Sequence, residues 1–395
     1  MYEKISVIIP NYNYAQFLQR RIDSVVNQTV KPAEIIFLDD CSTDDSLIVA
    51  EQILSRAGIP FRIIANETNQ GVFKQWLKGI ELAQYDYFWI AEADDYCELN
   101  FLETLLPAFD DKDVVMSYCD SYIINNSGDI VYDDLHWKNN FFETDIWSNN
   151  FIKNGKYMVE NFYSIINVSP NASAIVFNKN SLKLDYYNCI SNYKKIGDWL
   201  FYVICLSHSD KAKLAYYSNR CNYHVRHDNN VTTISRNDRL PIMYNESLSI
   251  YKYCFDNFFL PDITTSKIYS FISEWLNWYN IDDLTNELLF SIIKKDSGRY
   301  FFKTIKQDFF AYTNESSKYL EESKSLIDKN NILIKEINDM VEENKVLLES
   351  NKNLQKIYSH MLTSYSWKFT KPLRLLSFFF RKLINGILRK EDDES

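Results

Sequence analysis

A hydrophobic segment at residues 87–91 runs directly into three carboxylates, Glu92, Asp94 and Asp95. The aromatic and β-branched residues of the segment predict a buried strand. In an open α/β sheet, ligands bind at the carboxyl ends of the strands, and Mg²⁺ is commonly held by one or two carboxylates together with phosphate oxygens. The cluster therefore predicts a metal–phosphate site. The alternative from these residues alone is a solvated acidic turn that caps a helix near residues 100–109.

The elements before this segment alternate between strand and helix. Apolar runs predict strands at residues 4–10, 34–38, 61–65 and 87–91, and helical spacing or capping residues predict helices at residues 15–28, 46–57 and 71–83. Strands that alternate with helices across short links predict an α/β fold, a Rossmann-like and mostly parallel sheet flanked by helices. The turn after the first strand, residues 10–14, contains neither a GxGxxG pattern nor a Walker A lysine, so another device must hold phosphates.

Several short motifs in the predicted fold resemble those of family 2 glycosyltransferases, which have the GT-A fold. The motifs are SVIIPNYN at residues 6–13, LDDCSTD at 38–44, NQGV at 69–72 and EADD at 92–95, with GDW at 197–199 and YHVRH at 223–227 extending the match. The resemblance covers roughly residues 1–235.

The resemblance implies a binding site for a nucleoside-diphosphate sugar. Pro10 and Tyr12 would lie against the base and ribose, Asp40 would accept a hydrogen bond from the base, and Asp94 would lie near the ribose. Gly71, in the third motif, is also expected to contact substrate. For Asp40, the alternative is a capping role at the helix that follows it.

The resemblance also implies a divalent cation, Mg²⁺ or Mn²⁺, that bridges the diphosphate and neutralises the leaving group. Asp95 would be its ligand, His227 a further ligand or phosphate contact, and Arg226 a substrate contact. The sequence departs from the family pattern at two places. Glu92 stands where an Asp is common, and residues 74–76 replace a run that often includes a phosphate-contacting arginine.

Asp198 is the candidate catalytic residue. It lies at the start of an apolar helix predicted at residues 198–207, where the family has a general base. A sugar hydroxyl is a poor nucleophile at neutral pH, so a positioned carboxylate must remove its proton as the new bond forms. The family resemblance further implies inversion at the anomeric carbon. The alternative is an acid placed there because the helix dipole favours it.

The sequence divides into four regions: a catalytic domain at residues 1–239, a helical extension at 240–316, a coiled coil at 317–362 and a basic amphipathic tail at 363–395. Within the first region, residues 120–165 suit either an acceptor-binding insertion or a variable surface loop. Leucine and methionine recur every seven residues from Leu333 to Met361, which favours a coiled coil and homo-oligomers over one helix folded back on the domain.

The tail carries seven Lys or Arg residues and no acids between Thr363 and Lys390, interleaved with aromatic residues. This composition predicts an interfacial helix attracted to anionic lipid. The motif SYSWKFTKPLR at residues 364–374 resembles tails of bacterial surface-polysaccharide glycosyltransferases and their partners. A helix that docks on a partner glycosyltransferase is the alternative. We expect a cytoplasmic protein, peripheral on the inner face of the plasma membrane, since the sequence shows neither a signal peptide nor a spanning apolar run.

The composition excludes some classes of function. A net charge of −10 disfavours nucleic-acid binding, and seven scattered cysteines with no CxxC pair give no zinc or redox signature. The sequence thus predicts an inverting glycosyltransferase that extends a lipid-linked glycan for O-antigen or capsule. A nucleotidyltransferase and an inactive scaffold that acts through its coiled coil are the two alternatives.

Overall fold

The computed structural model describes residues 4–181, 189–227, 236–278 and 353–356. The chain divides into two compact units, residues 1–313 and 314–395. In the second unit only residues 353–356 are described, and they are helical. The predicted coiled coil and basic tail otherwise lie outside the described residues.

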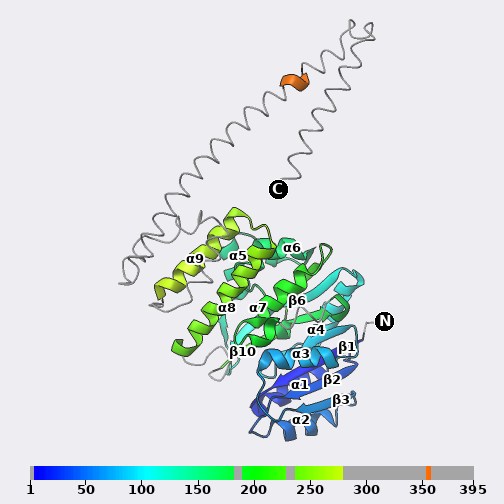
Figure 1. The fold of residues 1–395 in the computed structure, drawn as a ribbon. Coiled ribbons are helices and arrows are strands. Elements are labelled where there is room, and N and C mark those ends of the chain that lie inside the picture. The colour runs from blue at the N-terminus through cyan, green and yellow to red at the C-terminus, as the bar shows by residue number, and fades with distance from the viewer. Residues whose placement is uncertain (1–3, 182–188, 228–235, 279–352, 357–395) are drawn as a thin grey trace, which may run out of the picture. The chain divides into compact units, whose positions relative to one another are not determined.

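The N-terminal half is a parallel sheet with helices on both faces, as predicted. Its strands pair in the order β3-β2-β1-β4, and every residue of β1, β2 and β4 is buried. Figure 1 shows α1, α2 and α3 packed along these strands. The bounds are β1 (Ile5–Asn11), α1 (Ala15–Val26), β2 (Glu34–Asp39), α2 (Ser46–Leu54), β3 (Phe61–Ala65), α3 (Val72–Leu82) and β4 (Tyr87–Ile90).

The helix predicted at residues 100–109 is interrupted. An α-helix, α4 (Phe101–Leu105), gives way to a 3₁₀ turn, η1 (Leu106–Asp110). Pro107 lies at the start of that turn, where it can donate no backbone hydrogen bond and disfavours helical geometry in the residue before it. The helix predicted to reach residue 57 likewise ends earlier, at Leu54.

The second half of the domain completes the sheet with long strands from distant parts of the chain. Strand β9 (Ile175–Asn178) runs antiparallel between β4 and β6 (Val114–Asn125), and β10 (Lys213–Arg226) runs parallel to β6. A short strand, β5 (Tyr96–Cys97), closes the far edge against β10. The carboxyl ends of β1, β4, β6 and β10 therefore meet at one edge of the sheet.

Residues 120–165 are part of the folded core, so the surface-loop interpretation is wrong. They contain the end of β6, β7 (Ile130–Tyr132) on β6, α5 (Asp134–Phe142), η2 (Ile146–Ser148), β8 (Phe151–Asn154) on β10, α6 (Gly155–Met158) and η3 (Val159–Tyr163). Trp147 and Tyr163 are fully buried. The ammonium group of Lys138 is buried too, 2.8 Å from Asp134 and 3.9 Å from Asp120, which ties α5 to the sheet.

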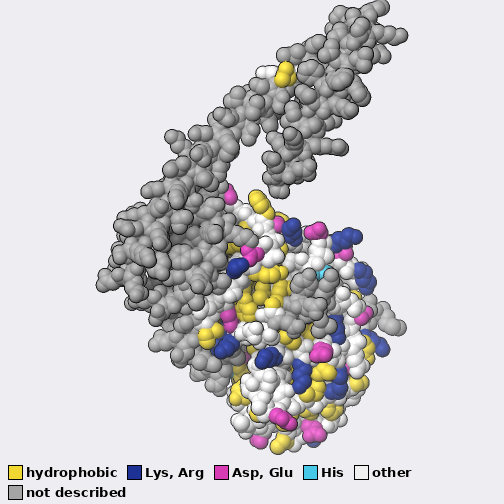
Figure 2. Space-filling view, viewed as in Figure 1, with side chains coloured by type: hydrophobic (Ala, Val, Ile, Leu, Met, Phe, Trp, Pro, Cys, Tyr) yellow, Lys and Arg dark blue, Asp and Glu magenta, His cyan; other side chains and the backbone are white. Residues whose placement is uncertain are grey.

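Three helices follow: α7 (Gly197–Ser207), α8 (Arg236–Asn257) and α9 (Asp262–Trp278). Residues of α8 and α9, such as Tyr251 and Ile268, belong to the same buried core as the sheet. Figure 1 shows α8 beside α7, and Figure 2 shows Lys, Arg and acidic side chains interspersed over the described part of one face. None of the helices within the described residues has the length and hydropathy to cross a membrane.

Helix α3 packs against β1 at Gly79. A Cβ at Gly79 would lie 2.3 Å from Cγ2 of the fully buried Ile8. Alanine gains up to about 1 kcal/mol in helix propensity, but overpacking a core costs about 1–3 kcal/mol. We expect Gly79→Ala to lower the free energy of unfolding by roughly 1–2 kcal/mol in urea melts. Glu81→Ala, on the exposed side of α3, is the control and should change it by less than about 0.5 kcal/mol. A stabilised Gly79→Ala protein would contradict this close packing.

Candidate functional site

The predicted acidic cluster is buried and held by partners from distant segments. Asp95 accepts a hydrogen bond from the backbone N–H of Val225, 3.0 Å away, through Oδ1 and another from the amide of Asn171 through Oδ2. Asp94 Oδ2 lies 3.1 Å from Nε2 of His227. The interpretation of the cluster as a solvated acidic turn is therefore wrong.

Glu92 has a different environment from the two aspartates. Its Oε1 accepts a hydrogen bond from the indole N–H of Trp76, 2.7 Å away, and its backbone carbonyl accepts one from Nε of Arg21 at 2.8 Å. Burial, followed by the charge of Asp94, raises the pKa of Glu92 to about 8, although Trp76 and Arg21 act against the shift. Glu92 is thus a neutral hydrogen-bonding group near pH 7, which does not favour it as a cation ligand.

The environment of Asp95 also disfavours the ionised form of its carboxyl group. Burial, followed by the charge of Asp94, raises its pKa to about 7, while Arg21 and the N–H of Val225 lower it. Two carboxylates this close in a buried site disfavour each other's charge. A divalent cation would remove that penalty, because its positive charge offsets the negative charge of the carboxylates.

Several residues that support the cluster carry no signal in the sequence. The ring of Phe17 stacks on His227 at 4.7 Å, and Tyr14 meets His227 edge-on at 5.5 Å. Burial, followed by the charge of Asp94, raises the pKa of Tyr14 far above its usual value. Asn222 donates a hydrogen bond of 2.9 Å to Oδ1 of Asn171, which orients that amide toward Asp95.

Asp40 anchors the loop before α3 rather than capping the helix that follows it. Its Oδ1 accepts hydrogen bonds from the amides of Asn66 and Gln75 and from the backbone N–H of Gln70, and its Oδ2 accepts one from the backbone N–H of Gly71, all at 2.7–2.8 Å. Gly71 has a φ of 89°, a conformation that side chains disfavour. The carboxylate thus fixes the N-terminus of α3.

The other residues predicted to contact the donor lie at the same corner of the sheet. Pro10 is buried near the end of β1, one residue before Asn11, whose carbonyl accepts the backbone N–H of Asp40. Tyr12 follows in the turn and is 46% exposed, so its ring is open to a ligand. The structure therefore brings Pro10, Tyr12, Asp40 and Gly71 together beside the carboxyl ends of β1 and β2.

Asp198 is half-buried in the first turn of α7. Its Oδ2 accepts a hydrogen bond from the amide of Asn167 at 2.9 Å. Burial raises its pKa to about 6, and backbone N–H groups of the first turn, its own and that of Trp199, act against the shift. The charges of Asp198 and Glu92 both add to the burial that raises the pKa of the Tyr202 hydroxyl well above its usual value.

Arg226 lies at the end of β10 beside the strand β7. It forms a hydrogen bond with Tyr132. Burial raises the pKa of Tyr132 to about 12, and the charge and hydrogen bond of Arg226 lower it. Burial, followed by the charge of Arg226, lowers the pKa of the neighbouring His224 to about 3, so this imidazole is neutral. Arg226 thus brings a positive charge to the carboxyl end of β10, next to Tyr132 of β7.

Comparison with known sequences identifies the family. The family model Glycosyl transferase family 2 matches residues 6–174. Residues 6–174 are a family 2 glycosyltransferase domain. An uncharacterized glycosyltransferase of Nostoc sp. is 38% identical over 112 residues, 28% of this chain and 34% of the relative. A chondroitin synthase of Pasteurella multocida is 30% identical over 134 residues, 34% of this chain and 14% of the relative. The chain thus spans about a third or less of the length of these relatives.

A solved structure supports the fold of this domain. The crystal structure of S. aureus TarS residues 1–349 in complex with UDP-GlcNAc matches with a TM-score of 0.51 and 16% sequence identity. The match covers 83% of this chain and 89% of that chain. It confirms the GT-A fold that the sequence predicted.

The residues of the site fit a cation that is bound together with a diphosphate. Among the residues that the structure describes, no three His, Cys, Asp or Glu side chains are arranged to hold a metal on their own. Nε2 of His227 pairs with Asp94, and the carboxylate of Asp95 accepts hydrogen bonds from Val225 and Asn171. Mg²⁺ and Mn²⁺ sites of this kind use one or two carboxylates and complete the coordination with water and phosphate oxygens. The donor set fits that arrangement and does not fit a preformed cage.

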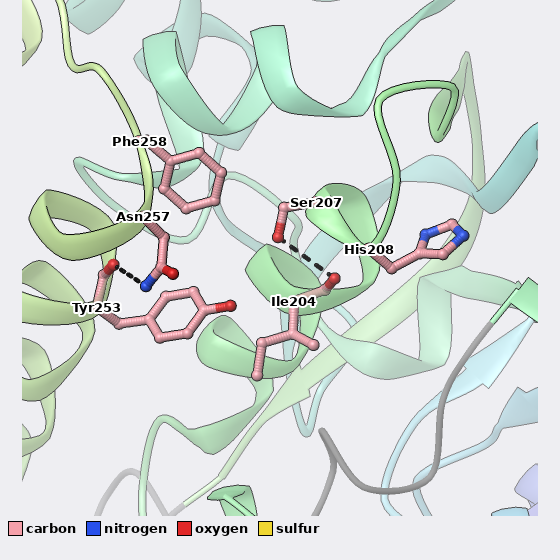
Figure 3. Close-up of a pocket in the computed structure, with 6 residues that line it drawn as sticks. All are labelled: Ile204, Ser207, His208, Tyr253, Asn257 and Phe258. Carbon is pink, nitrogen blue, oxygen red and sulfur yellow. Dashed lines mark hydrogen bonds between the residues drawn. The ribbon is translucent and has the colours of Figure 1, made fainter. Parts of the chain in front are cut away.

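A separate cleft lies at the other end of α7. Figure 3 shows its lining, which comes from the C-terminal ends of α7 and α8 and includes Ile204, Ser207, Tyr253 and Phe258; its volume is about 210 Å³. Asn257 donates a hydrogen bond to the carbonyl of Tyr253 within it. This cleft contains none of the predicted site residues, so the chemistry of the glycosyltransferase domain is expected at the acidic edge instead.

The contacts of Asp40 predict that its substitution changes stability as well as donor binding. In Asp40→Asn, an amide N–H₂ must face some of the donors that the carboxylate now accepts, and leaving buried donors unpaired costs about 1–3 kcal/mol. We expect urea melts of Asp40→Asn to show a free energy of unfolding lower by about 2 kcal/mol. Glu67→Gln, exposed in the same loop, is the control. Unchanged stability in Asp40→Asn would show that the carboxylate does not hold the loop.

Proposed function

We propose that the chain is a metal-dependent, inverting glycosyltransferase that transfers a sugar from a nucleoside-diphosphate donor to a lipid-linked glycan in bacterial cell-surface polysaccharide synthesis. The observation that carries the proposal is the family 2 match over residues 6–174 together with the burial of its motif carboxylates at one edge of the sheet. The chondroitin synthase relative supports a polysaccharide product.

The donor would bind with its nucleoside at the corner formed by Pro10, Tyr12, Asp40 and Gly71. Oδ2 of Asp40 makes one of the four hydrogen bonds of that carboxylate, so it has capacity to accept an N–H of the base. The exposed ring of Tyr12 offers a face for stacking. Asp94, in the turn that follows β4, would lie near the ribose. The complex of the structural relative with UDP-GlcNAc makes UDP-sugars the first donors to test.

The diphosphate would lie beside Asp95 and His227. These two residues would hold the cation, with His227 released from Asp94, and Arg226 would add positive charge at the same edge. When bound, Mg²⁺ or Mn²⁺ supplies Lewis-acid stabilisation of the charge that develops on the leaving nucleoside diphosphate. Glu92, neutral and bonded to Trp76, would support the turn without binding the cation.

Asp198 would act as the general base. Its carboxylate would accept the proton of the acceptor hydroxyl while that oxygen attacks the anomeric carbon and the bond to the diphosphate breaks, which inverts the configuration. The raised pKa of Asp198, about 6, suits a base that must be ionised near neutral pH yet bind a proton readily.

Lipid linkage of the acceptor and attachment to the inner membrane surface rest on the composition of residues 363–395. A basic amphipathic tail would keep the catalytic domain at the membrane surface, where a lipid-linked acceptor is found. Residues 317–362 would assemble the chain with copies of itself or with partner glycosyltransferases.

Asp95→Ala tests donor and cation binding together. We expect isothermal titration of the full chain with UDP-, GDP- and dTDP-sugars to show one donor that binds in the presence of Mn²⁺ and weakens by about 100-fold or more in Asp95→Ala, because metal-bridged phosphates supply several kcal/mol. Asp113→Ala, next to the first residue of β6 at the opposite edge of the sheet, is the control. If Mn²⁺ changes binding of no donor, the cation site is wrong; if no donor binds at all, the scaffold alternative gains support.

Asp198→Asn tests the general base and its pH dependence. The base must be ionised, so in the wild type we expect kcat to fall as pH drops through about 6, the pKa of Asp198. Asp198→Asn should lower kcat by about 10²–10⁴-fold with donor affinity unchanged. Asp210→Asn, exposed beyond the other end of α7, is the control. A variant that keeps wild-type kcat would exclude Asp198 as the base.

A further inference from the structure

A single carboxylate connects α8 to the segment that leads into α7. Glu246 accepts backbone hydrogen bonds from three consecutive residues, Lys194 at 2.5 Å, Lys195 at 3.1 Å and Ile196 at 2.8 Å. Hydrogen bonds to an ionised acceptor are shorter and roughly twice as strong as neutral ones. The segment that Glu246 holds ends two residues before Asp198.

The first turn of α7 is confined on its other sides as well. A Cβ at Gly197 would lie 2.7 Å from Cβ of Tyr193 and 2.9 Å from the ring of Phe73 on α3, so the turn is packed without space for a side chain. The indole of Trp199 meets the ring of Tyr251 on α8 edge-on at 5.5 Å. Helix α8 therefore touches this turn through both a charged and an aromatic residue.

We propose that Glu246 is a positioning residue for the transfer reaction: it holds the first turn of α7 so that the carboxylate of Asp198 meets the acceptor hydroxyl. This inference rests on the proposed function, because it gives a role to the same base. It also makes the helical extension part of the catalytic apparatus, since Glu246 lies beyond the residues that match the family model.

The charge of Glu246 acts on Asp198 in addition to its hydrogen bonds. Burial is the main cause of the raised pKa of Asp198, and the negative charge of Glu246 raises it further. The other groups that face Asp198 are the amide of Asn167 and the hydroxyl of Tyr202, both uncharged at neutral pH. Removing the charge of Glu246 therefore lowers the pKa of Asp198. The acid limb of the pH profile, in which kcat falls as Asp198 becomes protonated, then moves to lower pH.

The test uses the full chain, with Glu246→Gln compared with Asp256→Asn. Asp256 lies on the same helix and pairs with Lys252 at the surface. The measurements are Mn²⁺-dependent binding of the donor, release of nucleoside diphosphate as a function of pH, and hydrogen exchange of the peptide that contains residues 194–198. For Glu246→Gln we expect the donor affinity to stay within about twofold of the wild type. We expect kcat to fall by about 10-fold or more, because small displacements of a base are costly. The acid limb of the pH profile should lie at lower pH, and the amide hydrogens of residues 194–198 should exchange faster. Asp256→Asn should match the wild type.

Glu246→Asp keeps the charge on a shorter side chain, so it should restore the acid limb while kcat stays reduced; it also serves if Glu246→Gln does not fold. The inference is overturned if Glu246→Gln keeps the wild-type kcat and acid limb while Asp198→Asn is inactive, or if it loses donor affinity together with kcat. A wild-type chain that releases nucleoside diphosphate from no donor, or an active Asp198→Asn, would instead reject the proposed function and this role with it.

Discussion

The burial of Asp94 and Asp95 beside the half-buried Glu92 is the constraint on which the rest of the site depends. A buried charge without partners costs several kcal/mol, so each group needs a hydrogen-bond donor or a proton. The partners come from every part of the domain: Arg21 on α1, Trp76 on α3, and the backbone of Val225 on β10. The acidic turn thereby links the parallel N-terminal sheet to strands formed more than a hundred residues later.

The first half of this arrangement could be predicted from sequence because its signals are local. Apolar runs, turn residues and capping residues at short spacing determine β1 to β4 and the helices between them, with errors of a few residues at the ends. Where a boundary was wrong, a single residue such as Pro107 explains it. The structure also gives a role to two of the residues at positions 74–76, which depart from the family pattern. Gln75 donates a hydrogen bond to Asp40 and Trp76 donates one to Glu92, so residues that replace a typical run serve the motif carboxylates.

The second half could not be predicted because its contacts are distant in sequence. Strands β6 and β10 pair along almost their whole length although about a hundred residues separate them, and neither alternation nor turn signals reveal such a pairing. Asn171 and Asn222 are ordinary polar residues in the sequence, and only the sheet brings them to Asp95. The surface-loop alternative for residues 120–165 was wrong for the same reason. Polar residues flank the aromatic residues of this segment in the sequence, yet some of the aromatic residues gather around the buried Trp147.

The residues proposed to bind the nucleotide and those proposed to act on the acceptor lie in different parts of the chain. The residues proposed to bind the nucleotide lie within residues 6–174, which match the family model, whereas Asp198, His227 and Glu246 lie beyond it. Helices α7 and α8 run side by side in the same direction, since Glu246 meets Ile196 at one end and Tyr253 and Asn257 share a cleft with Ile204 and Ser207 at the other. Helix α8 therefore contacts α7 along its length, including the first turn, which also packs on Phe73 of α3. Because Asp40 holds the N-terminus of α3, that helix connects the proposed donor corner to the turn that carries the proposed base.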